Sequence, residues 1–286
     1  MALLVCSILL GLQALPGIFK PYSKGVGMML TKPPADQKGK DMLMIFHHFL
    51  SFGRLMNAVT FMTAAFVCPC KPLIWFFLLF GLAYTCLALY EVKAGPRADR
   101  FSVTPKFLNA MIALFGIMYG VYLLAVLIPS AEFDAFIAEM EASPTSPLSV
   151  GRPALVWVLI GYSVFQILLQ LPPLIAPAMG LEGYFGDSYK KADRYLKGQL
   201  EGYIKLMSCQ FLSVQIATAG LLFMTPSLYP VIVVYCFLNA YGIVLFSHNV
   251  INAEKFGIVI ASQIPWIVLS SLIEGIAIGA AMTAEY

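Results

Sequence analysis

Eight long apolar runs constrain this chain more than any other feature of its sequence. They lie at residues 2–19, 43–67, 72–92, 107–128, 154–176, 204–224, 228–248 and 257–283. An α-helix of about 20 apolar residues crosses the hydrocarbon core of a bilayer, where an open strand would find no hydrogen-bond partners. Charged residues make up only 12% of the chain, against about 25% in a soluble domain. The sequence therefore predicts an all-α, polytopic transmembrane bundle of about eight helices.

A pattern of prolines and glycine occurs twice along the chain. Leu-Pro-x4-Pro-x5-Gly is found at residues 15–27 and again at 171–183, 156 residues later. Landmarks shared by all four pairs of runs keep their order, for example Phe-Leu-Ser at 49–51 and 211–213. We therefore predict a tandem 4+4 parallel repeat, because four crossings return the chain to its starting side. The predicted parts are a first four-helix repeat at 1–130, an acidic amphipathic linker at 131–153 and a second four-helix repeat at 154–286.

The basic residues between the runs predict an orientation. Fifteen Lys and Arg residues fall in the segments on one side, and only Lys71 and Arg152 fall on the side that holds Met1. Short basic loops stay on the cytoplasmic, matrix or stromal side of a membrane. Both termini are therefore expected on the side opposite the Lys- and Arg-rich loops. The lack of an Asn-x-Ser/Thr site and of a cleavable signal favours the mitochondrial inner membrane, with plastid, endomembrane and bacterial membranes as alternatives.

Two segments between the runs predict short interfacial amphipathic helices. Residues 131–142 place four apolar side chains on one helical face and acidic residues on the other, so this helix would lie among lipid headgroups or cover a neighbouring protein. Residues 188–203 predict a mixed-charge helix on the basic side, whose tyrosines would anchor it at the membrane surface.

Two ionisable residues, Arg54 and Glu274, lie well inside apolar runs. A charge within the bilayer is costly and usually meets a partner of opposite sign. Both residues are expected near mid-depth if the last span effectively begins after Pro265. We therefore predict an intramembrane charge pair between Arg54 and Glu274, either as a structural lock between the halves or as part of a transport or proton-relay path. The alternative is that each charge meets a separate partner subunit.

The three histidines, His47, His48 and His248, are predicted to share a depth near the basic side, although they come from the second and seventh runs. With Glu91 and Gln210 they would form one polar cluster or two pseudo-symmetric ones. Facing imidazoles can ligate a haem b, and a histidine with a glutamate can hold a metal. The histidines are therefore a candidate cofactor site. The alternative is hydrogen bonding to headgroups or helix ends, and no metal site is assigned.

Two small-residue motifs indicate close helix packing. Gly116-x3-Gly120 lies in the fourth run and Gly275-x3-Gly279 in the eighth, at equivalent places in the predicted repeat. Glycines at this spacing let two helix backbones approach within lipid. We therefore expect the fourth and eighth helices to pack closely, with each other or with another helix.

No catalytic motif is found, and the segments outside the runs are too short for a catalytic domain. No catalytic residue is assigned, and the chain is expected to be no enzyme. We predict a non-catalytic accessory subunit of a larger membrane complex, in a respiratory or other energy-transducing membrane. Its expected partners are other membrane protein subunits and lipids, not nucleic acid. The alternatives are a transporter for a small or lipidic molecule, and a haem- or metal-binding membrane protein that uses the histidine cluster.

Overall fold

The computed structural model describes residues 2–19, 29–67, 71–96, 98–101, 103–127, 131, 135, 153–225 and 227–283. In this part of the chain the elements are helical, and the predicted all-α class is confirmed. Eight helices are long and apolar enough to cross a membrane: α1 (Ala2–Phe19), α3 (Gln37–Val67), α4 (Lys71–Lys93), α5 (Pro105–Leu127), α7 (Ala154–Ile175), α10 (Arg194–Met224), α11 (Leu228–Ile251) and α13 (Ile264–Thr283). Shorter helices are α8 (Pro177–Phe185), α9 (Asp187–Lys191), α12 (Ala253–Phe256) and the 3₁₀ turn η2 (Ile260–Ser262).

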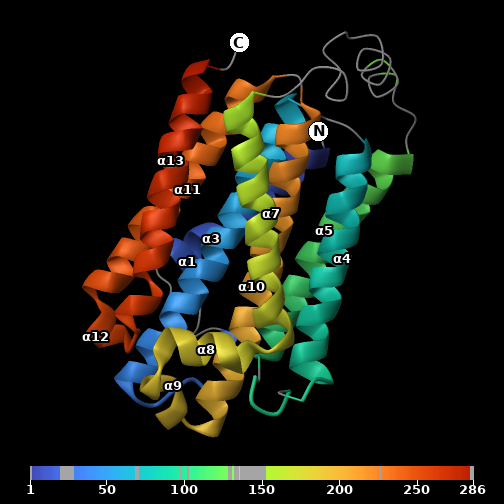
Figure 1. Ribbon diagram of the computed structural model, residues 1–286. Helices are drawn as coiled ribbons and strands as arrows, with labels where there is room; N and C mark the ends of the chain where they lie inside the picture. The colour runs from blue at the N-terminus through green and yellow to red at the C-terminus, as the bar shows by residue number, and fades with distance from the viewer. Residues whose placement is uncertain are drawn as a thin grey trace.

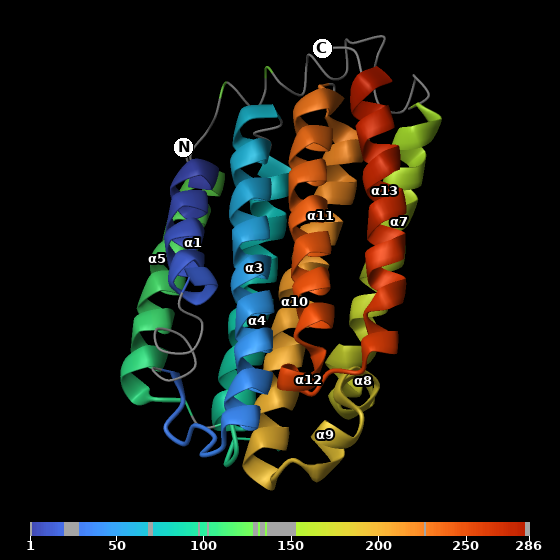
Figure 2. The ribbon, with the colours of Figure 1, turned by 90° about the vertical axis from the view of Figure 1, so that its left-hand side faces the viewer.

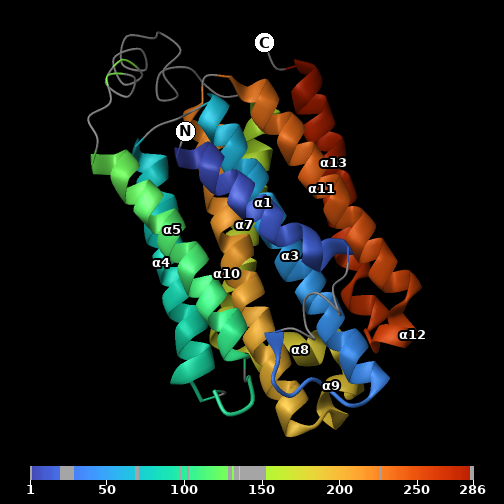
Figure 3. The ribbon, with the colours of Figure 1, turned by 180° about the vertical axis from the view of Figure 1, so that it is seen from behind.

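The two longest helices, α3 and α10, lie side by side at the centre of the bundle (Figure 1). Helix α1 packs on α3, and α7 packs on α10. The remaining long helices form two pairs on opposite sides of this centre: α4 with α5, and α11 with α13 (Figures 1 and 3). In the outer helices α4, α5, α7 and α13, at most 28% of the residues of each candidate spanning window are buried, as expected of helices that face lipid.

One end of the bundle carries the polar segments. Helices α8, α9 and α12 lie at this end, whereas α1 begins and α13 ends toward the other (Figure 2). Residues 29–36, 94–96, 98–101 and 103–104 belong to the same polar end, where Leu30 and Val103 form an isolated β-bridge. Most described Lys and Arg residues lie in or beside these segments. The eight apolar helices are thus consistent with an integral membrane protein, and the described basic residues gather at one end of the bundle. Which side of a membrane this end faces stays a prediction.

Both central helices begin at an aspartate. Asp36 Oδ2 accepts a hydrogen bond from the backbone N–H of Gly39 at 3.0 Å, and Asp193 Oδ1 accepts one from Leu196 at 2.8 Å. Each carboxylate satisfies an N–H group that has no partner within the first helical turn.

The single helix predicted at residues 188–203 is interrupted before Asp193, which caps the start of α10. The backbone of Ala192 is extended, so α9 ends at Lys191 and α10 begins at Arg194. Residues 194–203 are therefore the first turns of a long spanning helix rather than a separate interfacial helix. The other predicted interfacial helix, at 131–142, lies almost wholly outside the described residues.

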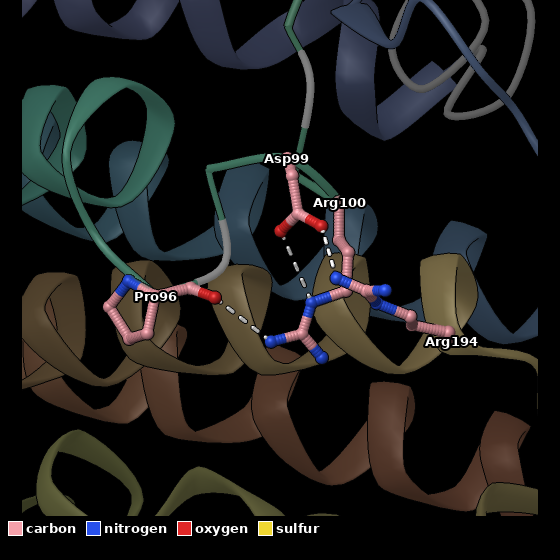
Figure 4. A network of polar contacts seen from close by, with 4 residues as sticks. All are labelled: Pro96, Asp99, Arg100 and Arg194. Atoms are coloured by element: carbon pink, nitrogen blue, oxygen red, sulfur yellow. Dashed lines mark hydrogen bonds and ion pairs between the residues drawn. The ribbon is translucent and has the colours of Figure 1, made fainter.

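A surface network joins the α4–α5 connection to the start of α10 (Figure 4). Arg194 Nη2 lies 2.5 Å from Asp99 Oδ2, and Arg100 Nε lies 3.5 Å from Asp99 Oδ1. Arg100 Nη2 also donates to the Pro96 carbonyl at 3.0 Å. Because the Arg194 and Asp99 side chains are largely exposed, the network positions this loop but adds little to stability.

The Asp193 cap is testable by substitution. Asp193→Ala removes the only side-chain acceptor described for the Leu196 N–H, and we expect it to lower the free energy of unfolding by about 1 kcal/mol. Asp193→Asn keeps a capping oxygen and should lose much less. Unfolding of the purified protein in detergent measures both variants, and equal stability of the Ala and Asn variants would contradict the assignment.

Candidate functional site

Polar side chains meet where α3 and α10 touch. Asn57 Nδ2 donates to Gln210 Oε1 at 2.9 Å and to the Gly53 carbonyl at 2.9 Å. A Cβ atom on Gly53 would lie 3.1 Å from the Gln210 Cβ, so the backbones approach closely here. Within lipid the hydrophobic effect does not hold helices together, and close packing with interhelical hydrogen bonds replaces it.

The structure brings together two of the three predicted histidines. His48 Nε2 lies 3.4 Å from the Tyr241 hydroxyl of α11, and His48 is near enough to His248 for their charges to interact. His47 lies on another face of α3, against Gly17 of α1 and the Tyr203 ring. This separation follows from the turn of about 100° between consecutive helical residues.

The separation of the histidines bears on the predicted haem or metal site. In the described part of the chain, no group of three His, Cys, Asp or Glu side chains could hold a metal ion. The residues near His48 and His248 therefore add no third ligand of these types, and the haem b interpretation stays a prediction without further geometric support.

The predicted pair Arg54–Glu274 is not found among the described ion pairs. Glu274 Oε2 instead accepts a hydrogen bond from Asn239 Nδ2 at 2.8 Å, and this amide also donates to the Ser270 carbonyl at 2.9 Å. Arg54 faces α4 and α5, on the other side of the bundle. Depth alone suggested the pair, but the two residues lie on helix faces that point toward different neighbours.

An ion pair that the sequence reasoning missed joins α4 to α10. Lys205 Nζ lies 2.6 Å from Glu91 Oε1, and the Glu91 side chain is fully buried. Opposite charges at matching depths near the basic ends of two apolar runs were the available signal. Lys205 was counted among the fifteen basic residues of the segments on one side, and Glu91 was assigned to the histidine cluster.

Within the chain, the predicted G-x3-G motifs make few close contacts. A Cβ on Gly116, Gly120 or Gly275 would meet nothing within 4 Å, and one on Gly279 would meet only the Leu155 side chain at 3.5 Å. The close approaches occur at other glycines. A Cβ on Gly17 would lie 2.9 Å from the Ser51 Cβ, so α1 needs a glycine where it crosses α3.

An apolar cavity of about 290 Å³ lies among α3, α7, α8, α10, α11 and α13. We call it the amide cavity because uncharged amides line it among aromatic rings: Gln166, Gln170, Gln215 and Asn239. No charged residue lines it in the described part of the chain. The amide oxygen of Gln215 is buried and has no hydrogen-bond partner there. A concave apolar site with a few converging polar groups is typical of small-molecule binding.

Tyr184 of α8 lies in the lining of the amide cavity at the polar end of the bundle. Its hydroxyl accepts a hydrogen bond from Asn249 Nδ2 at 3.1 Å. Burial raises the pKa of Tyr184 well above its ordinary value, so the phenol stays neutral. The ring also packs against Phe46 and Phe185, which fixes α8 against α3.

A second cavity, of about 60 Å³, lies between α3, α4, α5 and α10. We call it the arginine cavity because Arg54 is the charged residue in its lining. The other lining residues are almost all apolar, and Tyr84 and Thr85 supply the remaining polar groups.

Comparison with protein-family models, with curated proteins and with solved structures finds no match to this chain. The functional argument therefore depends on the geometry of these cavities and on the charges near them.

If Glu91 and Lys205 form a buried ion pair, removing Lys205 alone should destabilise the protein much more than neutralising both residues. Lys205→Met removes the described cation partner of the buried Glu91 carboxylate, and we expect a loss of about 3–5 kcal/mol in the free energy of unfolding. The double variant Glu91→Gln with Lys205→Met also removes the buried charge and should recover much of that loss. Unfolding in detergent measures both, and a double variant no more stable than Lys205→Met would be inconsistent with a paired charge.

The α1–α3 crossing predicts a difference between two glycines. Gly17→Ala would push a methyl group into Ser51 and lower stability by about 1–3 kcal/mol. Gly116→Ala meets open space and adds helix propensity, so it should leave stability unchanged or slightly raised. Melting temperatures of the two variants check this, and equal effects would show that the crossing is looser than the structure indicates.

Proposed function

We propose that this protein binds an uncharged lipidic molecule in the amide cavity, without catalysis, inside a frame made of two parallel four-helix repeats. The observation that carries the proposal is the cavity itself, which combines apolar walls with uncharged amides and one unsatisfied amide oxygen. This is the second of the functions that the sequence suggested, restricted to binding.

The lengths of the long helices, and the residues at which they begin, support the 4+4 repeat. Helices α3 and α10 each contain 31 residues. They begin at residues 37 and 194, and α4 and α11 begin at residues 71 and 228, so both pairs start 157 residues apart. The capping aspartates at 36 and 193 differ by the same number. A duplicated four-helix unit accounts for all three observations.

The pattern of helix neighbours also supports the repeat. Helix α1 packs on α3 as α7 packs on α10, and α4 packs on α5 as α11 packs on α13. Between the proposed halves, α10 contacts α4 while α3 contacts α11. A twofold axis along the α3–α10 contact exchanges the members of each of these pairs, as expected for halves of the same polarity.

The lining of the amide cavity favours an uncharged ligand. A charged headgroup would find no counter-ion there, and a buried charge without a partner is strongly disfavoured. Most walls are aromatic or aliphatic, which suits a hydrocarbon body. The free Gln215 oxygen is a hydrogen-bond acceptor, so the ligand's polar head should offer a donor such as a hydroxyl group.

The volume of the amide cavity limits how much of a ligand it can hold. About 290 Å³ lies near the lower end of the range for small-molecule sites, roughly 300–1,000 Å³. The cavity would hold the head and first part of a lipidic molecule, not a whole two-chain phospholipid. Gly180, Pro173 and Trp266 in the lining are only half-buried, so the rest of such a molecule can extend toward the surface.

The accessory-subunit role and the mitochondrial location stay predictions. Exposed side chains such as Trp75, Leu79 and Leu124 form apolar outer surfaces on α4 and α5. Lipid or another membrane subunit would cover these surfaces equally well.

Filling the amide cavity tests the proposal. Gly242 lies in its lining, and a Cβ there would meet nothing within 4 Å, so Gly242→Phe should place a ring in the cavity. We expect native mass spectrometry of the protein purified from its membrane to detect an uncharged bound lipid, and Gly242→Phe to lose it. The matched control is Gly161→Phe, on an exposed face of α7 with equal space.

Gly161→Phe should retain the lipid. Equal retention by Gly242→Phe and Gly161→Phe, or a co-purifying lipid that is anionic only, would contradict the proposal.

A further inference from the structure

Arg54 is a buried arginine for which the described part of the chain offers no partner. Its residue is 5% exposed, and its Nε atom is buried without a hydrogen bond. The described ion pairs involve Asp99 and Glu91 as acids, and none includes Arg54. A guanidinium stays charged at any physiological pH, so this site holds a positive charge that no described carboxylate neutralises.

The charges near Arg54 do not supply a described counter-ion. Glu91 of α4 is fully buried, but its Oε1 atom lies 2.6 Å from Lys205 Nζ. His47, on the same helix, interacts electrostatically with Arg54 but cannot neutralise it. Asp41, near the start of α3, is also buried, but it accepts a hydrogen bond from Gln37 Nε2 at 2.9 Å. No acidic residue forms a described ion pair with Arg54.

Arg54 lines the arginine cavity, whose walls are otherwise suited to hydrocarbon. Leu50, Ala88, Phe107 and Met111 contribute to the lining. Ile112 belongs to the same lining and is 45% exposed on the outer surface of α5. The apolar wall is therefore continuous with the surface that faces lipid. An entering chain could pass along this wall while its head meets Arg54.

We propose that the arginine cavity binds the carboxylate of a single-chain amphiphile, with Arg54 as its counter-ion and Tyr84 beside it. The planar guanidinium matches a carboxylate through two parallel hydrogen bonds, and such pairs are strong in a low-dielectric site. The hydroxyl of Thr85 is already engaged by Tyr119 and the Gly81 carbonyl. Arg54 and Tyr84 therefore provide the donors that a carboxylate head would use.

The depth of Arg54 favours a carboxylate over a lipid phosphate. Arg54 lies seventeen residues after Gln37, or about 25 Å along α3 from the start of this helix. A carboxylic acid can enter hydrocarbon in its neutral form and ionise beside the guanidinium, because a nearby cation favours the charged form. A phosphate keeps its charge and would carry a larger head, often with two acyl chains, into a cavity of about 60 Å³.

Equilibrium binding of radiolabelled palmitate to the purified protein in detergent tests the proposal. We expect saturable binding at one site, weakened about tenfold or more by Arg54→Gln through loss of charge-assisted hydrogen bonds. The matched control Lys106→Gln removes an exposed positive charge and should bind as the unaltered protein does. Hexadecanol, which has the same chain without the charge, should compete poorly.

Several results would overturn the proposal. These are unchanged palmitate binding by Arg54→Gln, equal competition by hexadecanol, and stronger displacement by lysophosphatidate, which would assign the site to phosphate. If Arg54→Gln does not fold, Ala88→Phe decides the question, because it fills the cavity and keeps Arg54. Loss of binding in Ala88→Phe supports the proposal, and retained binding refutes it.

A further variant separates this site from the amide cavity. Gly242→Phe should leave palmitate binding unchanged, because Gly242 lies in the other cavity. Loss of palmitate binding in Gly242→Phe would place the fatty acid in the amide cavity and overturn the assignment to Arg54, whatever the outcome for uncharged lipids.

Discussion

The contact between α3 and α10 is the interaction on which the rest of the structure depends. These two helices carry much of the buried polar surface of the chain, and Gly53 with the Asn57–Gln210 hydrogen bond holds their backbones close. Lipid is as apolar as the outer helices, so burial of hydrocarbon cannot by itself choose which helices pair. At the centre, polar contacts determine that α3 pairs with α10. The other helices pack around this central pair: α1 on α3, α7 on α10, and the pairs α4–α5 and α11–α13 on opposite sides.

The two sides of this centre offer different chemistry. The amide cavity has uncharged polar groups, whereas the arginine cavity has one buried cation among apolar walls. In the proposed repeat the two sides descend from the same four-helix unit, so the difference would lie in a few side chains rather than in the backbone. At the offset of 157 residues between the starts of α3 and α10, Arg54 corresponds to Phe211. At this offset the Phe-Leu-Ser segments at 49–51 and 211–213, which are 162 residues apart, are not equivalent positions. Such divergence would let one frame hold two ligands of different charge.

The sequence predicted the eight spanning helices because hydrocarbon thickness fixes their length and backbone hydrogen bonding fixes their conformation. It did not predict that α10 begins at Arg194, since its first turns are polar, although the capping aspartate was a readable signal. Residue spacing gives depth along a helix but not the neighbour that each face meets. For that reason the sequence suggested a pair between Arg54 and Glu274, whereas the buried ion pair described in the structure joins Glu91 and Lys205. The amide cavity was missed because neutral glutamines give no charge signal inside an apolar run, and only the assembled bundle shows that Gln166, Gln215 and Asn239 converge.

Disulfide cross-linking within the membrane tests the parallel α3–α10 arrangement most directly. In a variant without the native cysteines, Val67→Cys would be combined with Thr225→Cys, because the Thr225 hydroxyl lies 3.4 Å from the Val67 carbonyl. The comparison pair combines Val67→Cys with Arg194→Cys, at the opposite end of α10. The account predicts that oxidation links residues 67 and 225 and leaves 67 and 194 unlinked. Cross-linking of 67 with 194 instead would mean that the central helices run antiparallel, and would contradict the fold and both cavities.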